Sequence, residues 1–321
     1  MIEVKNLVKR YGAHCAVDHL NFTVEEGQIY GFLGPNGAGK STTMNIMTGY
    51  LSPTEGEIIV NGRKISEEPG EVRRLIGYLP EIPPLYTDMT VKETLEFAAG
   101  LKKVPKKEIP GQVEKVMEMT HISQVGSRVV KNLSKGYRQR VGLAQAIIGF
   151  PPVIILDEPS VGLDPQQIIE IRELILSLSK NHIIILSSHI LSEIQAVCNH
   201  ILIINHGRLI ASDTPENLEA RYGKDNSLEL IAESSVETVQ RALGAVQGIN
   251  VLTIAQSGNQ VEVKLTYPKE KDPRVGLFYA FAKESCPIVT MRVTEATLEQ
   301  VFLNLIAEDA KAAQEEEAVR A

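Results

Sequence analysis

The stretch Gly34-Pro35-Asn36-Gly37-Ala38-Gly39-Lys40-Ser41 decides the fold of this chain. It fits the pattern Gly-x-x-x-x-Gly-Lys-Ser/Thr, in which glycines let the backbone bend until several amide N–H groups point at one anion. Lys40 adds a mobile positive charge, and Ser41 offers a hydroxyl to Mg²⁺, which prefers oxygen ligands. An apolar run, 27–33, precedes the loop and a helical pattern, 41–48, follows it. Strand, glycine loop and helix together predict a site for nucleotide phosphates rather than a chance glycine-rich turn.

The bulk composition is that of a folded protein with one large domain or two smaller ones. The chain has 321 residues, of which 43% are hydrophobic and 23% charged. A net charge of −7 argues against a nucleic-acid-binding surface. The spacing of Cys15, Cys198 and Cys286 fits no metal or redox motif. No apolar run approaches the ~20 residues that cross a bilayer, so we expect neither a leader nor a membrane span.

The first 220 residues alternate strand-like and helix-like stretches, which predicts an α/β fold with a mainly parallel sheet covered on both faces. The expected strands are 2–8, 21–24, 57–60, 153–156, 183–186 and 201–204. The expected helices are 90–101, 111–119, 166–179 and 191–197. Thr90, with Glu93 three residues on, has the pattern of a capping box. We place the end of this domain, 1–220, before the polar stretch 221–226.

The remainder, 226–307, predicts a small α+β domain. Its order is strand 228–232, helix 236–243, strands 251–255 and 261–265, helix 274–283 and strand 288–292, which is that of a ferredoxin-like unit. No aromatic, basic RNA-binding motif occurs in it, so a regulatory or dimer-supporting role is favoured. A last helix, 298–306, follows, and we expect the acidic tail 308–321 to be frayed.

Two carboxylates, Asp157 and Glu158, end the apolar strand 153–156. Behind a phosphate-binding loop, Asp157 is placed to hold Mg²⁺, and Glu158 to orient and polarise a water for attack on a γ-phosphate. The alternative, a buried strand whose acidic end faces solvent, is disfavoured by the loop upstream.

A third motif, Leu133-Ser134-Lys135-Gly136-Tyr137-Arg138-Gln139-Arg140, follows in the expected order with Lys40, Asp157, Glu158 and His189. Together these residues resemble the ATP-binding subunit of ATP-binding cassette (ABC) transporters over 1–220. The family signature is Leu-Ser-Gly-Gly-Gln, and this chain departs from it at Lys135 and Tyr137. The resemblance implies a P-loop ATPase domain, the ABC cassette, followed here by the small ferredoxin-like domain.

In that family two cassettes pair head to tail, with ATP between the P-loop of one and the signature of the other. Carried over, Ser134 and the backbone N–H of Gly136 contact the γ-phosphate across the interface. Tyr11 resembles the aromatic residue that stacks on adenine, against the alternative of a core tyrosine. His189 resembles the switch histidine, whereas the other histidines, His14 among them, are interpreted as ordinary. The resemblance assigns ATP contacts to Tyr11, Gly34, Pro35, Asn36, Gly37, Ala38, Gly39, Lys40, Ser41, Thr42, Ser134, Gly136 and Asp164.

Glu81 occupies the place of the glutamine that helps to coordinate Mg²⁺ in most of the family. This form resembles exporters of the ABC-2 type, and the segment 80–89 would then lie near the membrane partner; an ordinary loop charge is the alternative. The segment 296–303 resembles a closing helix of ABC-2-type ATPases, including gliding-motility and multidrug-export members. The implied metal ligands are Ser41, Glu81 and Asp157.

We therefore expect an ATP-hydrolysing subunit of an ABC-2-type exporter, with Lys40, Glu158 and His189 as catalytic residues and ATP and Mg²⁺ as cofactors. It would work as a homodimer or heterodimer with a second ATPase chain and a separate transmembrane permease, without nucleic acid. Its place would be cytoplasmic, peripheral on the inner face of the cell membrane. The alternatives are a soluble ABC ATPase acting on ribosomes or DNA, disfavoured by a single cassette and no coiled coil, and an inactive scaffold.

Overall fold

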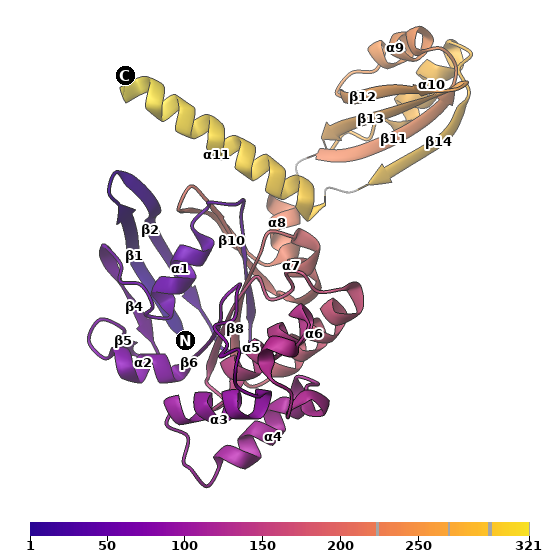
Figure 1. The fold of residues 1–321 in the computed structure, drawn as a ribbon. Coiled ribbons are helices and arrows are strands. Elements are labelled where there is room, and N and C mark those ends of the chain that lie inside the picture. The colour runs from indigo at the N-terminus through magenta and orange to yellow at the C-terminus, as the bar shows by residue number, and fades with distance from the viewer. Residues whose placement is uncertain (223–224, 269, 295–296, 321) are drawn as a thin grey trace. The chain divides into compact units, whose positions relative to one another are not determined.

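The protein divides into two compact units, Met1–Thr214 and Pro215–Ala321 (Figure 1). The computed structural model describes residues 1–222, 225–268, 270–294 and 297–320. The boundary that the sequence suggests, 221–226, includes 223–224, which lie outside the described residues. The observed division falls before helix α8 (Pro215–Tyr222), because α8 packs against α11 (Leu298–Arg320) of the second unit.

The first unit contains two sheets. The antiparallel sheet has the order β2-β1-β4-β5, from β1 (Ile2–Tyr11), β2 (His14–Val24), β4 (Glu55–Val60) and β5 (Arg63–Lys64). The other has the order β10-β9-β3-β8-β7-β6, from β3 (Ile29–Leu33), β6 (Ile76–Leu79), β7 (Val153–Asp157), β8 (Ile183–Ser188), β9 (His200–Asn205) and β10 (Arg208–Asp213). All neighbours in this sheet are parallel except β9 and β10. The predicted mainly parallel sheet is confirmed.

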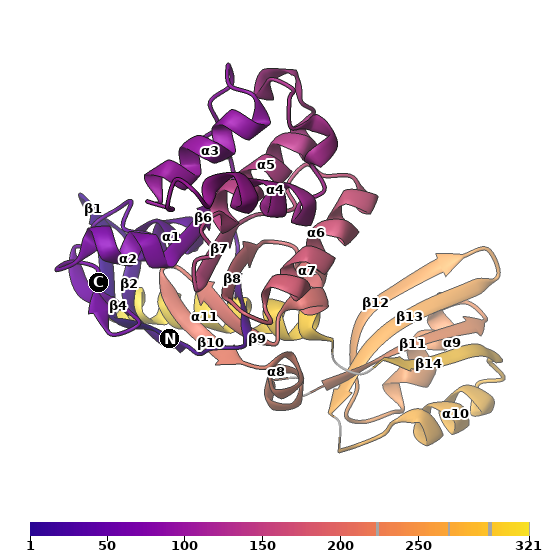
Figure 2. The same ribbon diagram turned by 90° about the horizontal axis from the view of Figure 1, so that it is seen from below.

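Helices connect these strands. They are α1 (Lys40–Met47), α2 (Pro69–Leu75), α3 (Val91–Leu101), α4 (Ile109–Met119), α5 (Lys135–Ile147), α6 (Pro165–Leu178) and α7 (Leu191–Val197), with 3₁₀ turns at Ser123–Val125 and Val130–Asn132. The capping box before α3 is confirmed, since Thr90 Oγ1 accepts from the Glu93 amide and Glu93 Oε2 from the Thr90 amide. Helices α3, α4 and α5 contact one another and form a group at one end of the unit (Figures 1 and 2).

One apolar core joins the two sheets of the first unit. Helix α1 contacts β2 of one sheet and β7 of the other, so its apolar side packs between them. Burying such large side chains stabilises the fold by about 1.5–3 kcal/mol each. Buried members of this core from β1, β3, α1, β7 and β8 are Ile2, Leu7, Phe32, Met44, Met47, Ile155 and Ile185. The core therefore fixes the start of α1 against the ends of β3 and β7.

The second unit contains an antiparallel sheet of order β12-β13-β11-β14. Its elements are β11 (Asp225–Glu233), α9 (Val236–Gly244), β12 (Asn250–Ser257), β13 (Gln260–Pro268), α10 (Arg274–Lys283) and β14 (Ile288–Thr294). The succession βαββαβ with the first strand paired between the third and fourth is the ferredoxin-like arrangement, as predicted. Leu230, Val263 and Phe281 are fully or almost fully buried in its core.

The C-terminal tail differs from the expectation. Residues 308–321 were predicted to be frayed, but α11 continues without interruption to Arg320. The tail is composed almost entirely of alanine, glutamate and other strong helix formers, so propensity alone favours extending the helix. The closing-helix motif begins at Ala296, which lies outside the described residues, and its helix begins at Leu298.

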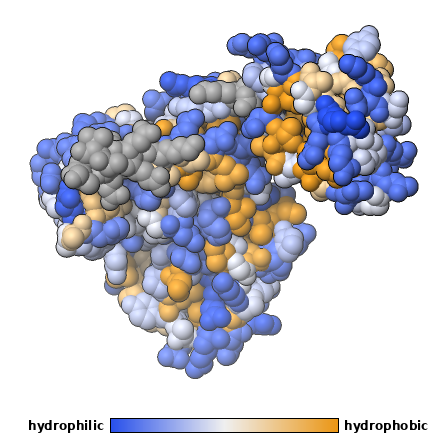
Figure 3. Space-filling view, turned by 90° about the horizontal axis from the view of Figure 1, so that it is seen from above, coloured by the Kyte–Doolittle hydropathy of each residue, from blue (hydrophilic) through white to orange (hydrophobic). Residues whose placement is uncertain are grey.

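Apolar side chains are exposed at several places on the surface. Within the described residues, no helix combines the length and the hydrophobicity needed to cross a bilayer. Figure 3 shows hydrophobic residues at the surface among hydrophilic ones. The most exposed large apolar side chains of the first unit include Tyr50, Ile82 and Leu101.

Candidate functional site

The phosphate-binding loop lies between β3 and α1, as its sequence predicts. Gly39 precedes α1 with a left-handed φ of 100°, and a Cβ at this position would lie 2.4 Å from the carbonyl oxygen of Ala16. Only glycine fits there, because other residues strain at such a φ and the neighbouring backbone leaves no room. The loop therefore leads directly into the start of α1, whose positive dipole end favours anions.

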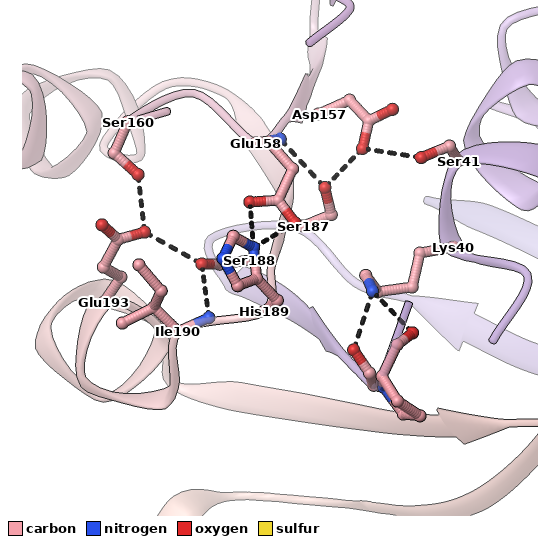
Figure 4. A network of polar contacts seen from close by, with 12 residues as sticks. Lys40, Ser41, Asp157, Glu158, Ser160, Ser187, Ser188, His189, Ile190 and Glu193 are labelled. Carbon is pink, nitrogen blue, oxygen red and sulfur yellow. Dashed lines mark hydrogen bonds and ion pairs between the residues drawn. The ribbon is translucent and has the colours of Figure 1, made fainter. Parts of the chain in front are cut away.

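Lys40 begins α1 and is only 7% exposed. Its ammonium donates to the carbonyl oxygens of Gly34 at 2.7 Å and Pro35 at 3.1 Å, so the side chain folds back over the loop (Figure 4). Burial lowers the pKa of Lys40, and the nearby carboxylates of Glu158 and Asp157 counteract this shift in part. A buried cation beside a glycine loop is ready to exchange carbonyl oxygens for phosphate oxygens.

Asp157 ends β7 beside the loop and is 3% exposed. Its Oδ1 accepts from Ser187 Oγ at 2.5 Å and from Ser41 Oγ at 3.3 Å (Figure 4). A serine hydroxyl and a carboxylate within contact distance form the hard oxygen donor set that Mg²⁺ prefers. The residues present therefore fit the expected metal.

Glu158 follows Asp157 with a left-handed φ of 49°, a strained conformation for a non-glycine residue. Ser187 Oγ accepts from its amide at 3.0 Å and so holds the strained turn in place. The carboxylate meets His189, whose Nδ1 lies 3.1 Å from Oε1 and 3.0 Å from Oε2. An ionised carboxylate only accepts hydrogen bonds, so the His189 tautomer that donates from Nδ1 fits this contact.

A cavity of about 460 Å³ brings most of the predicted ATP contacts together. Its lining contains Tyr11, His14, Ala16, Asn36, Gly37, Ala38, Gly39, Lys40, Ser41, Thr42, Glu81, Glu158, Val161 and His189. Tyr11 is 50% exposed, so it is not a core tyrosine, and the Lys9 ammonium lies 5.3 Å from its ring centroid. Glu81 reaches the same cavity. His14, which the sequence analysis interpreted as ordinary, lines it as well.

The signature residues lie outside the lining of this cavity. Ser134 caps α5, with Oγ accepting from the Tyr137 amide at 3.4 Å, and Gly136 packs so closely on Gln167 that a Cβ would lie 2.3 Å from its Oε1. Asp164 caps α6 by accepting from the Gln167 amide at 2.9 Å. Tyr137 and Asp164 line a separate polar cavity of about 580 Å³. Within the part of the chain that the structure describes, the signature residues thus do not line the P-loop cavity.

Several polar residues of the site were not assigned a role from the sequence. Ser187 holds both Asp157 and the backbone of Glu158, and Ser188, Ser160 and Glu193 form a second cluster beside it (Figure 4). Two serines directly before His189 at the end of a buried strand were the available signal. No feature of the sequence distinguished Glu193, because a glutamate in a helix pattern usually faces solvent.

Comparison with known proteins gives the family. A family model described as ABC transporter matches residues 17–161. The bacitracin transport ATP-binding protein BcrA of Bacillus licheniformis is 40% identical over 226 residues, which are 70% of this chain and 73% of that protein. The linearmycin resistance ATP-binding protein LnrL of Bacillus subtilis (strain 168) is 29% identical over 308 residues, 95% of this chain and 98% of its own length.

A solved structure agrees with the fold and the reaction. It is a dimeric, post-hydrolysis ATP-binding cassette bound to ADP and Pi, with a TM-score of 0.62 and 25% identity over 67% of this chain and 98% of its own. The fold and the P-loop site define an ABC-type ATPase. The chain belongs to the ATP-binding proteins of ABC transporters, as an ATPase subunit of the exporter type, and the transporter prediction is thereby confirmed over the soluble alternative.

Proposed function

We propose that two copies of this chain, or this chain and a similar one, close around two ATP molecules and so drive a separate membrane-spanning subunit. The observation that carries the proposal is the separation of P-loop and signature. Lys40, Glu158 and His189 share one cavity, whereas Ser134 and Gly136 lie outside its lining. A signature that contacts the γ-phosphate must then come from a second chain.

The chemistry follows from the residues around the cavity. Glu158 accepts the proton of the attacking water, and His189 holds that carboxylate in position from the other side. Lys40 exchanges the carbonyl oxygens of Gly34 and Pro35 for the outer phosphate oxygens. Together with Ser134 of the opposing chain it stabilises the charge that develops on the transferring phosphoryl group.

Ser41 and Asp157 would hold Mg²⁺, with Glu81 as a further oxygen donor at the same cavity. When bound, the ion neutralises negative charge on the β- and γ-phosphates. Ser187 keeps Oδ1 of Asp157 aimed at this position through its hydrogen bond. Glu81 adds a second negative charge where the family usually has a neutral amide, so metal binding should compensate it.

The segment 80–89 is the proposed contact with the membrane subunit. Ile82 is 82% exposed and Tyr86 54% exposed, although both are large apolar side chains. Apolar groups left in solvent commonly mark a protein interface. The protein would act at the cytoplasmic face of the membrane without nucleic acid, as its net charge of −7 favours, with 1–220 as the cassette and 226–307 as an accessory domain.

The test is a pull-down from detergent-solubilised membranes of the source cell. The bait is the tagged Glu158→Gln chain with ATP and Mg²⁺, which traps the closed pair because hydrolysis is slowed. Glu173→Gln on the exposed side of α6 is the matched control. We expect the Glu158→Gln bait to recover a multi-span membrane protein at near-equal amounts. Ribosomal or DNA-associated proteins without a membrane protein would contradict the proposal.

A further inference from the structure

Glu193 is a buried carboxylate close to Glu158 and His189, which we call the catalytic pair, and it has no part in the chemistry proposed above. It lies on α7 and is 9% exposed. Its Oε2 accepts two hydroxyl hydrogen bonds, from Ser160 at 2.5 Å and from Ser188 at 2.9 Å (Figure 4). Within the described residues it forms no ion pair, so these hydroxyls are what satisfies the buried charge.

The two serines belong to the two loops that carry the catalytic pair. Ser160 lies two residues after Glu158, and Ser188 directly precedes His189. Ser188 Oγ also accepts from the amide of Ile190 at 3.0 Å, so it holds the backbone on the far side of His189. One oxygen atom of Glu193 therefore joins the loop after β7 to the loop after β8.

This connection bears on the distance between Glu158 and His189. The ladder between β7 and β8 ends with the pair Asp157 and Ser187, and Ser160 and Ser188 lie beyond this end of the ladder. The two hydrogen bonds that Glu193 accepts from Ser160 and Ser188, here called the Glu193 clamp, connect the two loops beyond the end of this ladder. Its loss would let the carboxylate and the imidazole drift apart without touching the P-loop.

We propose that Glu193 is a positioning residue that fixes Glu158 against His189 by clamping their loops through Ser160 and Ser188. The inference rests on the proposed function, because it concerns the same hydrolytic site. It acts through hydrogen-bond acceptance rather than through charge, since both contacts are donated by neutral hydroxyls.

The test measures kcat and KM for ATP in the full chain with two substitutions of Glu193 and one control substitution. Glu193→Leu keeps the volume and removes the acceptor, and we expect kcat to fall about 10- to 100-fold, the cost of misplacing reacting groups by about 1 Å. KM should stay near wild type because the P-loop is untouched. Glu193→Gln keeps an acceptor oxygen and should retain most of the activity. Gln195→Ala, exposed on the same helix, is the control.

A double-mutant cycle separates positioning from general packing. In a His189→Ala background, Glu193→Leu should cause little further loss, because the pair that it positions is already broken. Equal fractional losses in both backgrounds, or wild-type kcat in Glu193→Leu, would overturn the inference. If Glu193→Leu does not fold, Ser160→Ala breaks only one arm of the clamp and must still lower kcat without changing KM.

The same data distinguish this inference from the proposed function. Wild-type hydrolysis that requires His189 but ignores Glu193→Leu and Ser160→Ala would overturn the clamp alone. Hydrolysis that is unaffected by Glu158→Gln and His189→Ala would overturn both.

Discussion

Both carboxylate oxygens of Glu158 face one nitrogen of His189, at 3.1 and 3.0 Å. Glu158 also lines the P-loop cavity. A base that is held by its neighbour and open on one side can meet a water above a bound γ-phosphate. Under the proposed function the two residues have different roles: Glu158 accepts the proton, and His189 restrains Glu158 through these contacts.

Glu158→Gln should preserve ATP binding and slow turnover about 10²-fold or more, because an amide cannot accept the proton of water. Binding is followed with a fluorescent ATP analogue and turnover by phosphate release. Glu173→Gln serves as the control. Turnover at the wild-type rate in Glu158→Gln would remove the assigned role of the base.

Ser134→Arg should abolish hydrolysis by disturbing the opposing nucleotide site, as should Lys40→Ala by disabling the P-loop. Because each dimer of the proposed kind combines the P-loop of one chain with the signature of the other, mixing the two inactive variants should restore one intact site per mixed pair. Phosphate release from the mixture checks this. Since Ser134 caps α5, the melting temperature of Ser134→Arg is measured alongside. A mixture as inactive as its components would refute the shared site.

Ser187→Ala should lower kcat and raise the Mg²⁺ concentration needed for half-maximal activity. The hydroxyl donates to Asp157 and accepts from the Glu158 amide, so its removal leaves a buried N–H unsatisfied at a strained residue. We expect a loss of about 1–3 kcal/mol in the free energy of unfolding. The measurements are a Mg²⁺ titration and urea unfolding, with Ser177→Ala on the exposed side of α6 as control. An unchanged Mg²⁺ requirement would contradict the placement of the metal at Asp157.

Lys102→Met should change how stability depends on pH. Burial lowers the pKa of Lys102 from 10.5 to about 8, so between these values the unfolded chain binds more protons than the folded one. The contribution of Lys102 to the free energy of unfolding of the wild-type protein therefore rises with pH across that window. The destabilisation caused by burying its charge is fully present below about pH 8. Lys102→Met has no titrating group at this position. Its free energy of unfolding relative to that of the wild-type protein should therefore decrease between pH 8 and 10. Urea unfolding of both proteins across this range checks the slope, and parallel curves would contradict it.

In the C-terminal unit, the order of the elements and the pairing of the strands were predictable from the sequence, whereas the end of the last helix was not. The order of its strands and helices was predictable from periodicity, and the ferredoxin-like pairing of β11 between β13 and β14 followed from that order. The end of α11 was not predicted correctly, because the acidic composition after residue 308 was interpreted as solvation when the same residues also favour a helix.

The sequence by itself determined the cassette, since Lys40, Asp157 and Glu158 stand in motifs whose spacing specifies local backbone geometry. It also predicted a position for His189 beside the P-loop, whose cavity His189 lines, because a residue after a parallel strand lies at the edge where the P-loop ends. Only the tertiary structure decided which polar side chains form hydrogen bonds with one another. Ser187 and Glu193 lie 30 and 36 residues beyond Asp157, the last residue of β7, and nothing local distinguishes them from a surface serine and a helix glutamate. Their partners are set by β7 pairing with β8 and by α7 packing against that strand, which are long-range contacts that no short motif encodes.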